Sequence, residues 1–155
     1  MCDYSLMTVP NRLARDGEEL VIHRFPTGSL GLASPDDVKR AAAPAPPVRK
    51  SVWQTIRDFF DPPAVAAVCA VCIPPGATLE IRDIPERLQK QWGVSSEETG
   101  VFTQISAAVN TYRDAVRFNN GKEVRLQDMR EGMRARVLTV EFAEAVELQT
   151  ESQLL

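Results

Sequence analysis

The sequence has few of the residues that usually carry chemistry, and its charges are nearly balanced. Among 155 residues it contains one histidine and three cysteines, with 18 basic against 21 acidic side chains and a formal net charge of -3. A surface that binds phosphates needs a clear excess of basic residues, so we expect no nucleic-acid partner.

Signals for export or membrane insertion are also lacking. The longest apolar run, residues 64–73, is about half of the ~20 residues that cross a bilayer, so we expect no membrane span. At the amino end Asp3 stands where a signal peptide has basic residues, and no apolar segment follows before Pro10. We therefore expect a cytoplasmic protein with reduced thiols. An odd number of cysteines further argues against a disulfide framework.

The sequence does have enough apolar side chains for a core, at 44% hydrophobic residues, and its length fits one domain over residues 1–155. Segments rich in branched and apolar residues recur between turn signals, as strands do. The expected strands are residues 19–25, 64–73, 78–81, 101–105, 116–118, 123–126 and 135–142. This pattern predicts a mainly β fold, a small antiparallel barrel or sandwich with two short helices.

Two of the expected strands are separated by Asn119-Asn120-Gly121. A two-residue loop would mix polar and apolar side chains on each face of the hairpin. A three-residue loop, 119–121, with its glycine in the left-handed conformation pairs Val116 with Val124 and Arg117 with Glu123. This register gives one apolar face and an ion pair on the other. A second hairpin is expected at the Pro-Pro-Gly turn between residues 64–73 and 78–81.

Residues 34–50 have four prolines and only two branched apolar side chains, which predicts a flexible linker rich in proline and alanine. An amphipathic helix follows at 51–60, with Ser51 as its N-cap. Its large apolar residues are Trp53, Ile56, Phe59 and Phe60. This helix either packs over an open end of the expected barrel or docks into a groove of a protein partner.

A second short helix is expected to start at Asp83, with Glu86 in the capping-box position, and to end before Gly93. Residues 144–155 form an acidic tail that shows no clear apolar face.

Two resemblances concern the ends of the chain. The opening Met-Cys-Asp-Tyr-Ser-Leu, with residues 71–76 and 118–121, resembles a group of short bacterial proteins without an assigned activity. That resemblance implies a bacterial source and no particular function. The first two residues are also similar to the start of class II glutamine amidotransferases, where the cysteine becomes the N-terminal nucleophile once Met1 is removed. Here Asp3 replaces the glycine expected next.

The cysteines and the histidine form the most specific constellation for chemistry. Cys69 and Cys72 make a CxxC, and with Cys2 and His23 they supply three thiolates and one imidazole, a ligand set that suits a tetrahedral zinc ion. Because Ala70 and the residue after it offer no turn chemistry, the sequence favours the simpler interpretation that the two CxxC cysteines are small buried residues of a core strand.

Taken together, these patterns predict a non-enzymatic β-domain that binds or helps assemble a protein partner through Trp53, Ile56, Phe59 and Phe60. The alternative is a cysteine-dependent enzyme with Cys2 or Cys72 as nucleophile, where the freed amine of Cys2 could act as base. The sequence contains neither a G-x-S-x-G elbow nor a phosphate-binding glycine loop.

Overall fold

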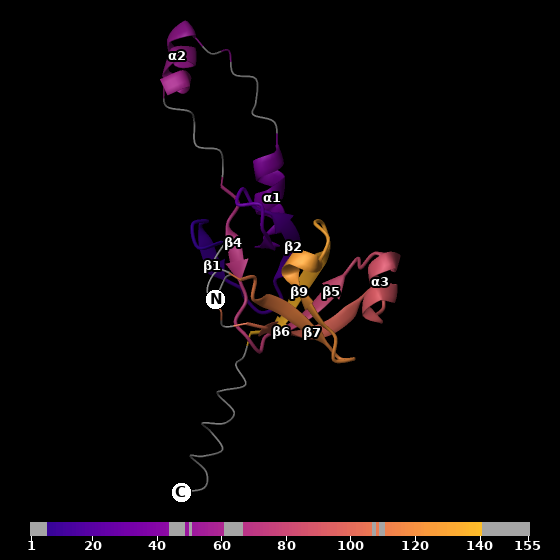
Figure 1. The fold of residues 1–155 in the computed structure, drawn as a ribbon. Coiled ribbons are helices and arrows are strands. Elements are labelled where there is room, and N and C mark those ends of the chain that lie inside the picture. Colours follow the sequence, from indigo (N-terminus) through magenta and orange to yellow (C-terminus); the bar gives the residue numbers. More distant parts are fainter. Residues whose placement is uncertain are drawn as a thin grey trace, which may run out of the picture.

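The computed structural model describes residues 6–43, 49, 51–60, 67–106, 108 and 111–140, with Asp58 described by its backbone only. The described part is mainly β, which confirms the predicted class (Figure 1). The strands are β1 Asn11–Leu13, β2 Glu19–Arg24, β3 Leu30–Ala33, β4 Ala70–Cys72, β5 Thr78–Arg82, β6 Glu98–Gln104, β7 Asp114–Phe118, β8 Glu123–Arg125 and β9 Arg134–Thr139. The helices are α1 Pro35–Ala42, α2 Val52–Phe60 and α3 Glu86–Trp92, with a 3-10 turn, η2, at Leu126–Asp128.

The nine strands form one mixed sheet in the order β1-β4-β3-β2-β9-β5-β6-β7-β8. The core lies on its inner face, because β2, β5 and β9 alternate buried apolar residues with exposed or half-exposed ones, most of which are polar or charged. The most deeply buried side chains in these strands include Leu20, Ile22, Leu79, Ile81 and Val137. Of the described helices, none combines the length and the apolar composition that crossing a membrane requires.

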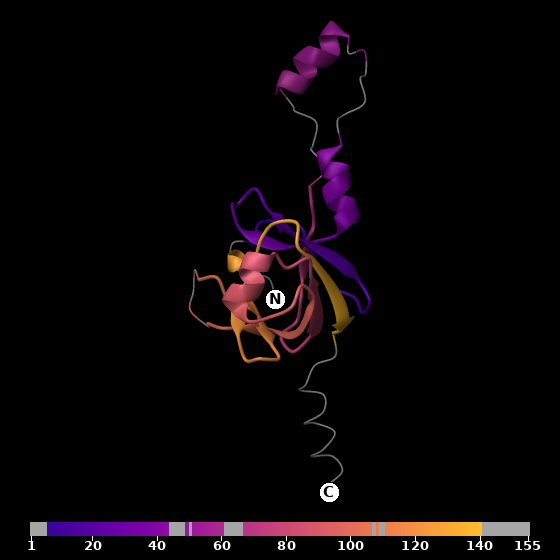
Figure 2. The same ribbon diagram turned by 90° about the vertical axis from the view of Figure 1, so that its right-hand side faces the viewer.

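The sheet is strongly curved, so η2, which follows the edge strand β8, lies next to β3 (Figure 2). Gln127 of η2 makes the connection, since its amide Nε2 donates to the carbonyl of Leu30 at 2.6 Å and its Oε1 accepts from the Leu30 N–H at 2.9 Å. The edge strands β1 and β8 do not pair with each other, so the sheet is open. The strands are also not all antiparallel, because β1 pairs with β4 in parallel.

The β7–β8 hairpin has the predicted register. Val116 pairs with Val124 and Arg117 with Glu123. Gly121 has φ +84, and its N–H donates to the carbonyl of Phe118 at 2.9 Å. The expected ion pair forms, with 2.6 Å between Arg117 Nη2 and Glu123 Oε1.

The predicted hairpin between residues 64–73 and 78–81 is wrong. The first strand is shorter, Ala70–Cys72, and it lies between β1 and β3, whereas β5 pairs with β6 and β9. The turn instead hydrogen-bonds to β6: Gly76 N–H donates to the carbonyl of Phe102, whose own N–H donates to Ala77, each at 2.8 Å. Residues 64–66 lie outside the described residues.

The linker predicted at 34–50 is wrong over its first half, because Pro35–Ala42 is the helix α1. Proline at the start, Asp36 and Asp37 in the first turn, and Lys39 and Arg40 in the last turn all favour this helix and its dipole. One apolar side chain, Val38, packs on a small core cluster. Residues 44–48 and the tail at 144–155 lie outside the described residues.

Candidate functional site

The aromatic helix α2 forms where the sequence predicts it. Ser51 and Gln54 make a reciprocal capping box. The Gln54 N–H donates to Ser51 Oγ at 3.4 Å, and the Ser51 N–H donates to Gln54 Oε1 at 3.2 Å. The first turn of the helix is therefore stabilised by its own residues.

The apolar side chains of α2 point into solvent. Trp53, Phe59 and Phe60 are each at least 80% exposed, and Ile56 is 46% exposed. Figures 1 and 2 both show α2 away from the sheet. In the structure, this helix therefore does not pack over the sheet.

Both ends of the segment that carries α2 are fixed at one place on the sheet. Ala33, the last residue of β3, pairs with Ala70, the first residue of β4, and neither has any exposed surface. The chain between them includes α1 and α2, so it leaves the sheet and returns to it at neighbouring strands. The sheet thus presents α2 on a segment anchored at both ends.

Three of the four predicted zinc ligands lie within the described residues. His23 lies in β2, half-buried, with Nδ1 at 3.7 Å from Glu131 Oε1. Cys69 is a free, half-buried thiol directly before β4. Cys72 in β4 is 7% exposed and disulfide-bonded, which overturns the expectation of reduced thiols at this residue. Cys2 lies outside the described residues.

Within the part of the chain that the structure describes, no three His, Cys, Asp or Glu side chains gather as metal ligands. A metal-binding thiolate and a disulfide sulfur exclude each other. The four-residue zinc site therefore stays a prediction for the reduced chain.

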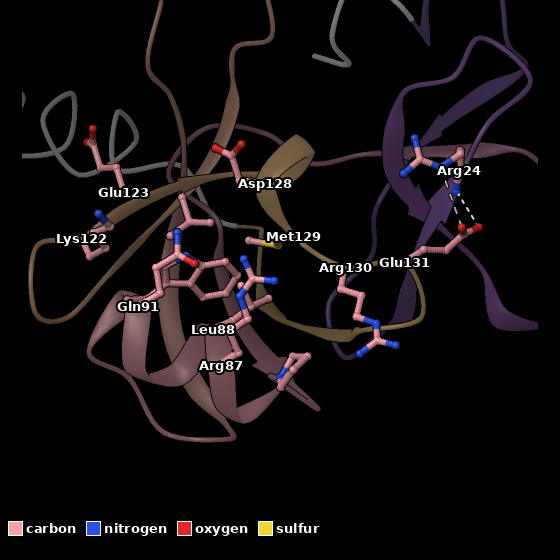
Figure 3. Close-up of a pocket in the computed structure, with 13 residues that line it drawn as sticks. Arg24, Arg87, Leu88, Gln91, Lys122, Glu123, Asp128, Met129, Arg130 and Glu131 are labelled. Carbon is pink, nitrogen blue, oxygen red and sulfur yellow. Dashed lines mark hydrogen bonds and ion pairs between the residues drawn. The ribbon is translucent and has the colours of Figure 1, made fainter.

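A hollow of about 920 Å³ lies beside α3 (Figure 3). Its walls come from α3, from the β7–β8 hairpin with β8, and from residues 128–131, with Arg24 at one end. Buried side chains of Trp92, Val124 and Met129 contribute its apolar lining, together with half-buried Leu88. The sequence carried no signal for this hollow, because its walls come from distant segments.

Charged residues surround this apolar lining, and each acidic one has a basic neighbour. Glu123 pairs with Arg117, and Asp128 Oδ2 lies 2.9 Å from Arg125 Nε. Glu131 accepts the backbone N–H of Arg24 at 3.1 Å, with the guanidinium Nε at 3.9 Å.

A pair of charged residues fixes the turn that leads into α3. Asp83 has φ +58, a left-handed conformation that is uncommon outside glycine, and both its carboxylate oxygens accept hydrogen bonds from Arg134 on β9. These hydrogen bonds lower the pKa of Asp83 below its usual value, with a further contribution from the positive charge of Arg134. Asp83 thus acts at this turn and is not the N-cap, which is Pro85.

Comparison with protein-family models, with curated proteins and with solved structures finds no match for this chain.

Proposed function

We propose that this protein is a non-enzymatic docking protein that binds a protein partner through α2. The observation that carries the proposal is the exposure of Trp53, Phe59 and Phe60 on a capped helix that is anchored to the sheet at both ends of its segment. Large apolar side chains exposed together on one short element are uncommon on a protein that works alone.

The spacing of the apolar residues favours a groove in a protein. Trp53, Ile56 and Phe60 stand at i, i+3 and i+7, the spacing of anchors on a helix that binds in an apolar groove. A helix that lies on a membrane surface usually has a polar face rich in lysine and arginine. The polar positions of α2 include a single basic residue, Arg57, next to acidic Asp58.

The energy available is enough for specific binding. Burying one large apolar side chain contributes about 1.5–3 kcal/mol, so three anchors could supply roughly 5–9 kcal/mol before the costs of association. The capping box lowers the entropy cost of ordering the helix on binding, because it already favours the helical conformation in the free protein. The curled sheet serves in this proposal as a small, partly closed barrel that holds the two ends of the segment.

Site-specific photocrosslinking tests the proposal. A photoreactive phenylalanine analogue replaces Phe59 in the full chain, and mass spectrometry identifies the crosslinked protein. The partner, once purified, should bind the natural chain and lose most of its affinity for Trp53→Ala, because hot-spot tryptophans carry much of the binding energy. Arg57→Ala on the same helix is the control and should bind nearly normally.

Two results would contradict the proposal. The first is a partner that binds Trp53→Ala as tightly as the natural chain. The second is partition of the natural chain, and not of Trp53→Ala, onto phosphatidylcholine–phosphatidylglycerol vesicles, which would make α2 a membrane-surface helix. For the cysteine-dependent enzyme, Cys72 as nucleophile would first require its disulfide to be reduced.

A further inference from the structure

The hollow beside α3 has basic side chains that form no ion pair with any acidic residue that the structure describes. Its three acidic residues are each engaged by an arginine, as described above. For Arg87, Lys122 and Arg130, which also line the hollow, no ion pair occurs among the described residues. The lining therefore holds four basic residues, Arg24, Arg87, Lys122 and Arg130, against these three acidic ones, a net charge of +1.

The position of Arg87 suits an anion inside the hollow. Figure 3 shows its side chain extending from α3 toward Met129, while Lys122 lies across the hollow on the hairpin. An arginine guanidinium can donate two parallel hydrogen bonds to one carboxylate. Leu88, Trp92 and Met129 line the same hollow and offer an apolar surface to the rest of a ligand.

We propose that this hollow binds a small organic acid with an apolar body, such as a medium-chain or aryl carboxylate. Its carboxylate pairs with Arg87, and Lys122 and Arg130 add positive charge at the rim. The apolar body lies over Leu88, Trp92 and Met129. The volume of about 920 Å³ lies within the range of small-molecule pockets, roughly 300–1,000 Å³. This site is separate from α2, so it stands or fails independently of the docking proposal.

Titration of the full chain with decanoate, followed by amide and indole NMR signals, tests the site. Decanoate should shift the amide signals of the lining residues 87–88, 91–92, 122–124 and 128–131, and the indole signal of Trp92. Decanol, which has the same chain without the charge, should bind at least about tenfold more weakly, because it cannot make the charged hydrogen bonds.

Variants separate the role of Arg87 from general charge effects. Arg87→Gln should weaken decanoate binding at least about tenfold and leave the fold intact, since this side chain makes no ion pair within the described part of the chain. Lys90→Gln is the matched control, because Lys90 lies on the same helix, pairs with Glu86 at 2.8 Å and does not line the hollow.

Three results would overturn the proposal. The first is that decanoate shifts only the signals of α2, or none at about 1 mM, a concentration at which even weak binding is detected. The second is that decanol binds as tightly as decanoate. The third is that Arg87→Gln binds decanoate as tightly as the natural chain does. Any one of these outcomes removes the carboxylate site.

Discussion

The side-chain amide of Asn120 connects the tip of the β7–β8 hairpin to the end of α3. Its Nδ2 donates to the carbonyl of Trp92 at 3.0 Å and to that of Gly93 at 2.9 Å. Carbonyls at the end of a helix have no partner within the helix, so Asn120 satisfies groups that water would otherwise bind. The ring of Trp92 also stacks on Phe118 of β7, with 6.2 Å between centroids. These contacts hold two walls of the hollow together.

Asn120→Ala should therefore destabilise the protein by about 1–3 kcal/mol, because three hydrogen bonds are lost together: the two to the end of α3 and the one that Asn120 Oδ1 accepts from the Lys122 N–H at 2.9 Å. Urea unfolding measures this free energy. Asn119→Ala, at the neighbouring exposed position, is the control and should change stability by less than about 0.5 kcal/mol. Equal effects of the two substitutions would show that the connection to α3 contributes nothing.

Replacing each of the two tryptophans by alanine should have very different effects on the stability of the protein. Trp92 is 4% exposed and lies in the main core, so Trp92→Ala should cost about 3–5 kcal/mol and lower Tm by roughly 10 °C. Trp53 is 80% exposed, so Trp53→Ala should change the stability of the isolated protein by less than about 0.5 kcal/mol. Thermal unfolding by circular dichroism compares them. A large loss of Tm in Trp53→Ala would mean that α2 packs on its own sheet.

The thiol content distinguishes a disulfide from a metal site. Cys72 is disulfide-bonded and Cys69 is free, so denatured but unreduced protein should titrate fewer thiols than the three of the fully reduced chain. Ellman's reagent measures the difference. Three reactive thiols without reductant, together with about one zinc per chain by elemental analysis, would instead support the predicted zinc site.

Local patterns in the sequence predicted local structure well. The β7–β8 register follows from which side chains must share a face, and α2 follows from its capping residues and apolar spacing. The strand β3 escaped prediction because Gly31 interrupts its short apolar pattern. A Cβ at this position would lie 2.7 Å from Leu6 Cδ1 and 3.0 Å from Phe25 Cε2, so these two side chains would have to shift to make room for it.

Contacts between distant segments could not be predicted in the same way. The prediction of a hairpin after β4 was wrong because the packing of the whole sheet, and not the turn between β4 and β5, determines which strands these two pair with. The hollow combines Arg24 with Glu131, which are 107 residues apart, and no local pattern indicates that pairing. The sequence likewise could not decide whether α2 packs on its own sheet or is exposed, because its apolar spacing fits both.

The ion pair between Asp83 and Arg134 gives a pH-dependent contribution to stability. Hydrogen bonds from Arg134 lower the pKa of Asp83 in the folded protein below the usual 3.8 that it should have when unfolded. The folded state therefore binds this proton less readily, so the stabilisation is complete above about pH 4 and is lost as the pH falls through the lowered pKa. Because both side chains are more than half exposed, the contribution to stability is small, and the pKa is the sharper measurement.

NMR titration of the Asp83 carboxyl carbon should give a pKa below the usual value, and Arg134→Gln should raise this pKa. Arg136→Gln, which removes another arginine of β9 that faces Glu19, is the control and should leave the Asp83 pKa nearly unchanged. A carboxyl that titrates at the same pH in the natural chain and in Arg134→Gln would contradict the role given to this pair at the start of α3.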